Sequence, residues 1–168
     1  MNESSIKQTL WFLALVLVQV LVFNHIHVAG YATPFIYIYF LLMLNLDTKR
    51  NTLLLAGFLL GLVIDMFANT PGMNAAATTL LAFLRPWLLS LFVPRDNTDD
   101  RRPGVRSMGF GPFLGYVLTA VFVHHTVLLL LDTFSFFDWR TLVLKVLAST
   151  ALTTFCVAVL DSTRKGKA

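Results

Sequence analysis

The sequence is poor in charge and in the residue patterns that carry catalysis. Asp, Glu, Lys and Arg make up 13% of its 168 residues, whereas soluble domains carry about 25%. A single cysteine, Cys156, excludes an internal disulfide framework and a thiol-rich metal site. No glycine-rich phosphate loop, Ser/His/Asp spacing or paired-carboxylate arrangement is present. We therefore predict a protein that is not an enzyme and that binds no cofactor.

The four histidines do not form a recognisable metal-binding pattern. His25 and His27 follow an apolar run, at a position where amphipathic rings are common beside a membrane. His124 and His125 are adjacent, so on a helix their side chains point about 100° apart and cannot chelate one ion together. We predict no metal site, and we assign His124 and His125 to packing or to polar contacts.

Apolar residues are abundant, at 57% of the chain, and the mean hydropathy is +0.72. They occur in six long blocks without a regular polar stripe, which is typical of helices surrounded by lipid. The blocks cover residues 7–23, 31–46, 52–67, 73–93, 112–131 and 141–160. Blocks 31–46 and 52–67 are shorter than the roughly 20 residues that a spanning helix needs, so they either cross as short helices or dip in as a pair. The sequence predicts an all-α membrane protein with one polytopic domain over residues 1–168.

Basic residues concentrate in alternate loops between these blocks. The loops on one side hold Lys7, Lys49, Arg50, Arg95, Arg101, Arg102, Arg106, Arg164, Lys165 and Lys167, whereas the loops on the other side hold Arg140 alone. Basic loops stay in the cytoplasm, so both termini and the loop 94–111 are predicted to be cytoplasmic. A re-entrant pair would move Lys49 and Arg50 to the outside, so this division favours six complete transmembrane helices.

The basic character of the chain does not indicate nucleic-acid binding. The loop 94–111, "PRDNTDDRRPGVRSMGFG", mixes acids with bases and lacks the interleaved aromatic residues that stack on bases. Topology and contact with membrane lipid headgroups account for its charge. We expect lipids as partners and no nucleic acid.

Besides Lys7 at the start of the first block, three charged residues fall inside the apolar blocks: Asp65, Arg85 and Lys145. Such a charge costs about 2.5 to 3.5 kcal/mol and usually faces a partner or a cavity. Asp65 lies roughly 18 Å, and Arg85 roughly 12 Å, from the cytoplasmic ends of their helices. One interpretation pairs Asp65 with Arg85 across the hairpin. In the other, Asp65 marks the outer end of a short helix while Arg85 reaches back to the cytoplasmic headgroups.

Small and turn-forming residues surround Asp65 and Arg85. Gly57 and Gly61 form a GxxxG pattern, which lets a second helix of the bundle or of a partner approach closely. Pro86 removes one backbone donor and predicts a kink beyond Arg85. We predict a polar or partner-contact site and a helix-packing face. The site comprises Asp65, Asn69, Gly72, Arg85 and Pro86, and the packing face comprises Gly57, Gly61, Ala75, Ala76 and Ala77.

The order of these features carries a family resemblance. "QVLVFNHIHVAGYATPFIYIYFLLML" is followed by "GFLLGLVIDMFANTPGMNAAATTLLAFLRP", with a GxxxD pattern, three consecutive alanines and an Arg-Pro pair. Over about residues 19–94 the chain resembles the rod shape-determining protein MreD family, and beyond them only the number and length of the blocks agree.

This resemblance implies a small multi-pass protein of the bacterial cytoplasmic membrane that serves cell elongation and peptidoglycan synthesis. The implied partners are the membrane-anchored MreC, the actin-like MreB, and RodA with its penicillin-binding protein partner. The implied fold is similar to the substrate-binding subunits of energy-coupling-factor transporters. We therefore expect a non-enzymatic membrane scaffold. The alternative is a small-solute-binding subunit of such a transporter, which would use the polar interior as a ligand pocket.

Overall fold

The computed structural model describes residues 3–23, 32–93, 102–133 and 138–163, and in this part of the chain it is helical without β-strands. The helices are α1 (Glu3–Leu21), α2 (Ile38–Leu42), α3 (Arg50–Ala68), α4 (Met73–Phe92), α5 (Val105–Met108), α6 (Phe110–Thr133) and α7 (Trp139–Thr163). Helices α3, α4, α6 and α7 are long and apolar enough to cross a membrane, and α1 contains a shorter apolar stretch, Gln8–Leu21. The chain is an all-α, multi-pass membrane protein.

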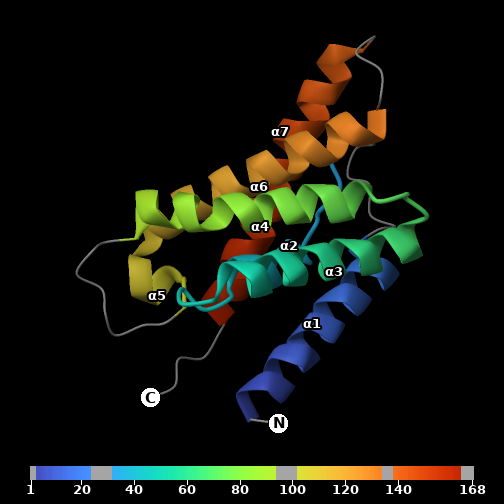
Figure 1. Cartoon of the computed structure of the whole chain (residues 1–168). Helices are drawn as coiled ribbons and strands as arrows, with labels where there is room; N and C mark the ends of the chain where they lie inside the picture. Colours follow the sequence, from blue (N-terminus) through green and yellow to red (C-terminus); the bar gives the residue numbers. More distant parts are fainter. Residues whose placement is uncertain (1–2, 24–31, 94–101, 134–137, 164–168) are drawn as a thin grey trace.

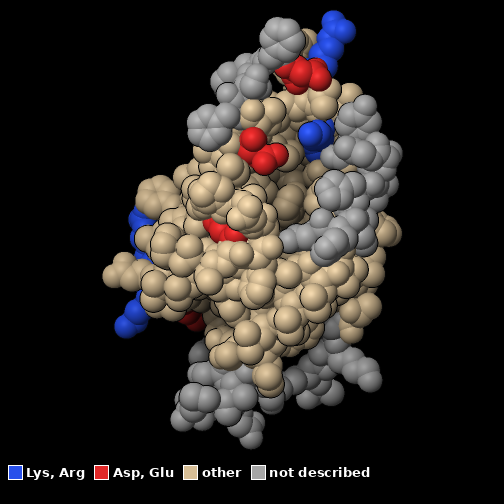
Figure 2. Space-filling view, turned by 90° about the vertical axis from the view of Figure 1, so that its right-hand side faces the viewer, with Lys and Arg blue, Asp and Glu red and all other residues tan. Residues whose placement is uncertain are grey.

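The long helices form a bundle in which chain neighbours are spatial neighbours (Figure 1). Helix α3 packs on α4, α4 on α6 and α6 on α7, while α1 packs on α3. Residues 69–72 turn the chain from α3 into α4, and we name this side of the bundle the hairpin end. The opposite side, where α1 begins and α7 ends, is the terminal end (Figure 1). Figure 2 looks onto the hairpin end, where most of the described surface is uncharged.

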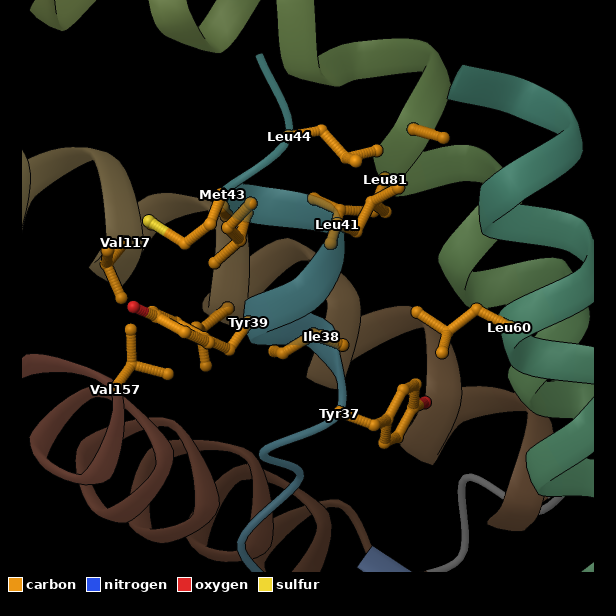
Figure 3. Packing of buried hydrophobic residues seen from close by; sticks show 14 of the residues in the cluster. Tyr37, Ile38, Tyr39, Leu41, Met43, Leu44, Leu60, Leu81, Val117 and Val157 are labelled. Carbon is orange, nitrogen blue, oxygen red and sulfur yellow. The ribbon is translucent and has the colours of Figure 1, made fainter. Parts of the chain in front are cut away.

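Residues 31–46 do not form the long helix predicted for them. Within the described residues 32–46 only α2 is helical, and it has five residues. Pro34 explains part of the difference, because it lacks an N–H and disfavours helix at the residue before it. Figure 3 shows this segment inside the apolar core, among side chains such as Leu60, Leu81 and Val157. Tyr37, like Ile38 within α2, is fully buried.

The segment before and within α2 runs alongside α7. Three hydrogen bonds join the two in order: Thr33 N to Ser149 Oγ (3.1 Å), Phe35 N to Thr153 Oγ1 (3.1 Å) and Tyr39 Oη to Asp161 Oδ1 (3.3 Å). Because the residue numbers rise together, the segment travels in the same direction as α7, toward the terminal end. Irregular backbone at this depth is tolerated only where the protein encloses it and satisfies its polar groups.

The other helices begin closer to the residues that the sequence predicts. Helix α1 begins at Glu3 and α3 at Arg50, each a little before the predicted block. Residues 94–101 of the predicted loop lie outside the described residues. The rest of that loop contains the short helix α5, and α6 begins directly after it at Phe110.

Candidate functional site

Asp65 lies one turn before the end of α3 and is 5% exposed. Its Oδ1 accepts hydrogen bonds from Thr70 Oγ1 (2.6 Å), Asn74 N (3.0 Å) and Asn74 Nδ2 (2.9 Å). Its Oδ2 accepts the N–H of Ala75 at 2.9 Å. The first N–H groups of a helix lack partners within that helix and favour a negative charge. Asp65 therefore caps α4 from the neighbouring helix, and this role explains a carboxylate at this depth.

A chain of buried hydrogen bonds continues inward from Asp65. Asn74 Nδ2 donates to Asp65 and to Thr70 Oγ1 (3.0 Å), so its carbonyl oxygen is free to accept the Tyr37 hydroxyl at 2.8 Å. His124 Nε2 lies 3.0 Å from the same hydroxyl oxygen. Because the Tyr37 proton points to Asn74, His124 Nε2 must carry the proton of this contact. Four elements are thereby joined through side chains: α3, α4, the segment before α2, and α6.

His125 has different partners from its neighbour, in line with the 100° between their side chains. Its Nδ1–H donates to the carbonyl of Val121 at 2.8 Å, so its Nε2 accepts the Thr153 hydroxyl at 3.2 Å. Thr153 Oγ1 in turn accepts the N–H of Phe35. The polar contacts predicted for both histidines are present. Among the described residues, no group of three His, Cys, Asp or Glu side chains is placed to hold a metal ion, and His25 and His27 lie outside those residues.

Arg85 lies on α4 toward the terminal end and is 1% exposed. Its Nη2 donates to the carbonyl of Leu42 at 3.2 Å and also to the carbonyl of Leu44. Tyr116 Oη donates to the Leu42 carbonyl as well, at 3.3 Å. The last carbonyls of a helix lack partners within it. Arg85 therefore caps the C-terminal end of α2, as Asp65 caps the N-terminal end of α4.

Asp65 and Arg85 do not pair, and the pairing interpretation is wrong. Asp65 bonds to Ala75, and Arg85 is ten residues further along α4, a separation of about 15 Å on the helix axis. The predicted depths were counted from the ends of the apolar blocks, so they did not account for this separation between Asp65 and Arg85 along α4. Asp65 does lie near the end of α3, as the second interpretation has it, but it also caps α4. The second interpretation is wrong for Arg85, which is buried and bonded to the end of α2.

Asp161 is a third buried charge, which the sequence pattern does not single out because it directly follows the last apolar block, 141–160. It is 8% exposed. Its Oδ1 accepts the Tyr39 hydroxyl at 3.3 Å, and its Oδ2 accepts the N–H of Val105, the first residue of α5, at 2.8 Å. Each of the three buried charges thus binds at or beside the end of a helix: Asp65 at α4, Arg85 at α2 and Asp161 at α5.

Gln19 was noticed only as part of the family resemblance, yet it is fully buried and holds the non-helical segment. Its Oε1 accepts the N–H groups of Ile36 (2.7 Å) and Tyr37 (3.4 Å), and its Nε2 donates to the carbonyl of Pro34 at 3.1 Å. The sequence signal was an amide side chain in an apolar block that precedes a proline-interrupted block.

The predicted glycine face lies inside the bundle. A Cβ on Gly61 would lie 2.3 Å from Thr78 Oγ1 and 2.4 Å from the carbonyl oxygen of Asn74. A Cβ on Gly57 would lie 2.8 Å from the carbonyl oxygen of Thr78. Of the predicted alanines, Ala75 and Ala77 are buried, whereas Ala76 is exposed. The close approach is therefore between α3 and α4.

The remaining predicted site residues form the turn or lie on the surface. Asn69 (φ 54°) ends α3 and Gly72 (φ 79°) precedes α4, both in the left-handed region and both exposed. Glycine adopts this region at little cost, and asparagine tolerates it better than most residues. Pro86 is exposed, and α4 continues through it to Phe92. The structure thus brings Asp65 and the turn together and leaves Arg85 and Pro86 at a distance.

No protein-family model, curated protein or solved structure matches the chain.

Proposed function

We propose that this chain is a non-enzymatic scaffold of the bacterial cell-elongation machinery, which synthesises peptidoglycan during rod-shaped growth. The observation that carries the proposal is the use of the buried charges. Asp65, Arg85 and Asp161 bind the backbone ends of the chain's own helices. Buried charges that bind helix ends hold the helices of a bundle in one arrangement. A scaffold requires such a fixed arrangement in order to present a constant surface to its partners.

The hydrogen bonds of Asp65 argue against a catalytic or ligand-binding carboxylate. Its two oxygens accept four hydrogen bonds from Thr70, Asn74 and Ala75. A solute or a reacting group would have to displace these bonds and leave buried N–H groups without partners, which costs about 1 to 3 kcal/mol for each group. The geometry therefore favours a structural role at this site.

In the proposed topology the chain crosses the bacterial cytoplasmic membrane six times, with both termini in the cytoplasm. Five crossings are the helices α1, α3, α4, α6 and α7, and the remaining one is the segment 32–46 that runs beside α7. The exposed Lys49, Arg50 and Arg106 lie at the terminal end, which this topology places in the cytoplasm. The fold similarity to substrate-binding subunits of energy-coupling-factor transporters remains part of the proposal.

The proposed partners are MreC, MreB, and RodA with its penicillin-binding protein partner, together with membrane lipids. The described residues present large apolar side chains outward on every long helix, including Trp11 and Leu17 on α1, Phe58 on α3 and Phe155 on α7. Lipid and the membrane spans of partners are the surroundings that suit such surfaces. Recognition within the membrane is the form of binding that these helices offer.

Depletion of the protein in a rod-shaped host that depends on it tests the proposal. We expect rounded cells, because elongation fails without its scaffold. Re-expression of the full chain should restore rods, and a variant that is absent from the membrane serves as the control. Loss of uptake of a small solute with unchanged cell shape would contradict the proposal and favour the transporter subunit.

A further inference from the structure

A second group of polar side chains lies where α6 packs on α7, and His124 links it through Tyr37 and Asn74 to Asp65. This group comprises His124 and His125 on α6 with Ser149, Thr150, Thr153 and Thr154 on α7, and we name it the α6–α7 seam. All six side chains are buried, with exposures of 5% or less. Three of the four buried polar side-chain atoms that lack a partner among the described residues belong to it: His124 Nδ1, Thr150 Oγ1 and Thr154 Oγ1.

The missing partner of His124 is a hydrogen-bond donor. Its Nε2 carries the proton that faces the Tyr37 oxygen, because the Tyr37 hydroxyl donates to Asn74. In a neutral imidazole the other nitrogen, Nδ1, is then an acceptor with a lone pair. Buried acceptors in folded proteins are almost always bonded to protein or to ordered water. This lone pair therefore requires an N–H or O–H group from outside the described side chains.

Thr150 and Thr154 differ from several other helical threonines of the described residues. Thr119 and Thr126 on α6 donate to the carbonyl one turn earlier, at 2.8 Å in both cases, and Thr79 on α4 does the same at 2.6 Å. A helical threonine can satisfy its own hydroxyl in this way. Thr150 and Thr154 make no such bond, so their hydroxyls remain available to a molecule within the bundle.

The relative positions of these atoms follow from one contact between α6 and α7. Thr153 and His125 bond at 3.2 Å, which sets the register between α6 and α7. His124 is adjacent to His125 on α6, and Thr154 is adjacent to Thr153 on α7. Thr150 lies one turn from Thr154 toward the hairpin end. The unpartnered atoms thus fall within about two turns of the same helix pair.

We propose that the α6–α7 seam binds neutral hydrogen-bond donors, either ordered water or a small uncharged polar solute such as an alcohol or amide. Neutrality follows from the groups present, because the seam contains hydroxyls and two imidazoles whose contacts each place one proton on the ring. A buried ion would meet no opposite charge among these six residues. Water in such a place typically makes about three hydrogen bonds to buried polar groups. The proposal does not depend on the scaffold role.

The sign of a stability change tests the proposal. Thr150→Val and Thr154→Val keep the side-chain shape and remove one hydroxyl each. If the hydroxyls bind a molecule, each variant should melt about 2 to 4 °C below the wild-type protein in the same detergent. Thr126→Val is the matched control, because this half-buried threonine bonds to the carbonyl of Phe122 within its own helix. Unchanged or higher melting temperatures for both seam variants would overturn the proposal.

Nitrogen NMR of the wild-type full chain supplies a test that does not require a variant to fold. With 15N-labelled histidine, His124 Nδ1 should show the shift of an unprotonated nitrogen that accepts a hydrogen bond. The shift of a free lone pair would overturn the proposal.

Native mass spectrometry separates the two sources of the donor. A solute appears as added mass that Thr150→Val or Thr154→Val reduces, whereas water leaves the bare protein mass while the melting and NMR effects remain. Either result supports the site and identifies its occupant, and the solute result would in addition favour the transporter subunit over the scaffold.

Discussion

Asp65 Oδ2 accepts the N–H of Ala75 at 2.9 Å, so the end of α3 caps the beginning of α4. This bond makes the hairpin a unit, because the same carboxylate also holds Thr70 in the turn. The close contact of Gly61 with Asn74 and Thr78 lies directly beside it. Capping and close helix packing thus support each other at the hairpin end.

Asp65 and Arg85 should act independently. Asp65→Asn removes the charge that faces the start of α4, and Arg85→Gln replaces the guanidinium that caps α2 with a shorter amide, so each variant should have a lower melting temperature. Each buried hydrogen-bonding group that loses its partner lowers the stability by about 1 to 3 kcal/mol. The double variant should show the sum of the two losses, measured as melting temperature in detergent. Recovery in the double variant would instead indicate a direct pair.

Gly61 should not tolerate a side chain. Gly61→Ala places a methyl carbon within 2.5 Å of atoms of α4, including the backbone of Ala75, so the two helices must separate. Overpacking of this kind typically costs about 1 to 3 kcal/mol. Gly111→Ala is the matched control, since a Cβ there meets nothing within 4 Å and the residue lies within α6. We expect a lower melting temperature for the first variant and an unchanged or higher one for the control.

Tyr37→Phe should weaken the contact among the segment before α2, α4 and α6. The change keeps the ring and removes the hydroxyl that bridges Asn74 and His124, so two fully or nearly buried groups lose a partner. A cost of about 1 to 3 kcal/mol follows for each group that stays unpaired. Thermal unfolding would reveal it, and wild-type stability in this variant would show that the bridge is not formed.

Gln19→Leu should release the non-helical segment. Leucine suits an apolar helix, yet it cannot accept the N–H of Ile36 or donate to the carbonyl of Pro34. We expect faster hydrogen exchange at residues 36 and 37 in the variant than in the wild-type protein. Val20→Leu, a change at a partly buried apolar neighbour, is the control and should leave exchange there nearly unchanged.

The sequence predicted the long helices because each depends on a local property, a run of apolar residues with a turn at its end. Residues 69–72 and the glycine face were found for the same reason, since left-handed turns and close packing restrict residue type locally. The non-helical course of residues 32–37 was missed. Its stability depends on Gln19, Ser149 and Thr153, which are distant in sequence.

The hydrogen-bond partners of the buried charges could not be predicted from the sequence either. Asp65 and Arg85 were recognised as buried polar features, but counting residues from the ends of apolar blocks cannot place one helix along another. Asp161 was not singled out, because it directly follows the last apolar block, although the fold brings α5 to it. A charge near the end of an apolar block is therefore a candidate cap for a neighbouring element, and its partner depends on the tertiary fold.

Affinity purification of the tagged full chain tests the scaffold proposal most directly. The chain is expressed in a rod-shaped host, extracted in mild detergent and analysed by mass spectrometry against an equally abundant tagged multi-pass protein. We predict enrichment of MreC, RodA and its penicillin-binding protein partner. Recovery of the subunits of an ATP-driven transporter, with none of the elongation proteins enriched, would contradict the proposal.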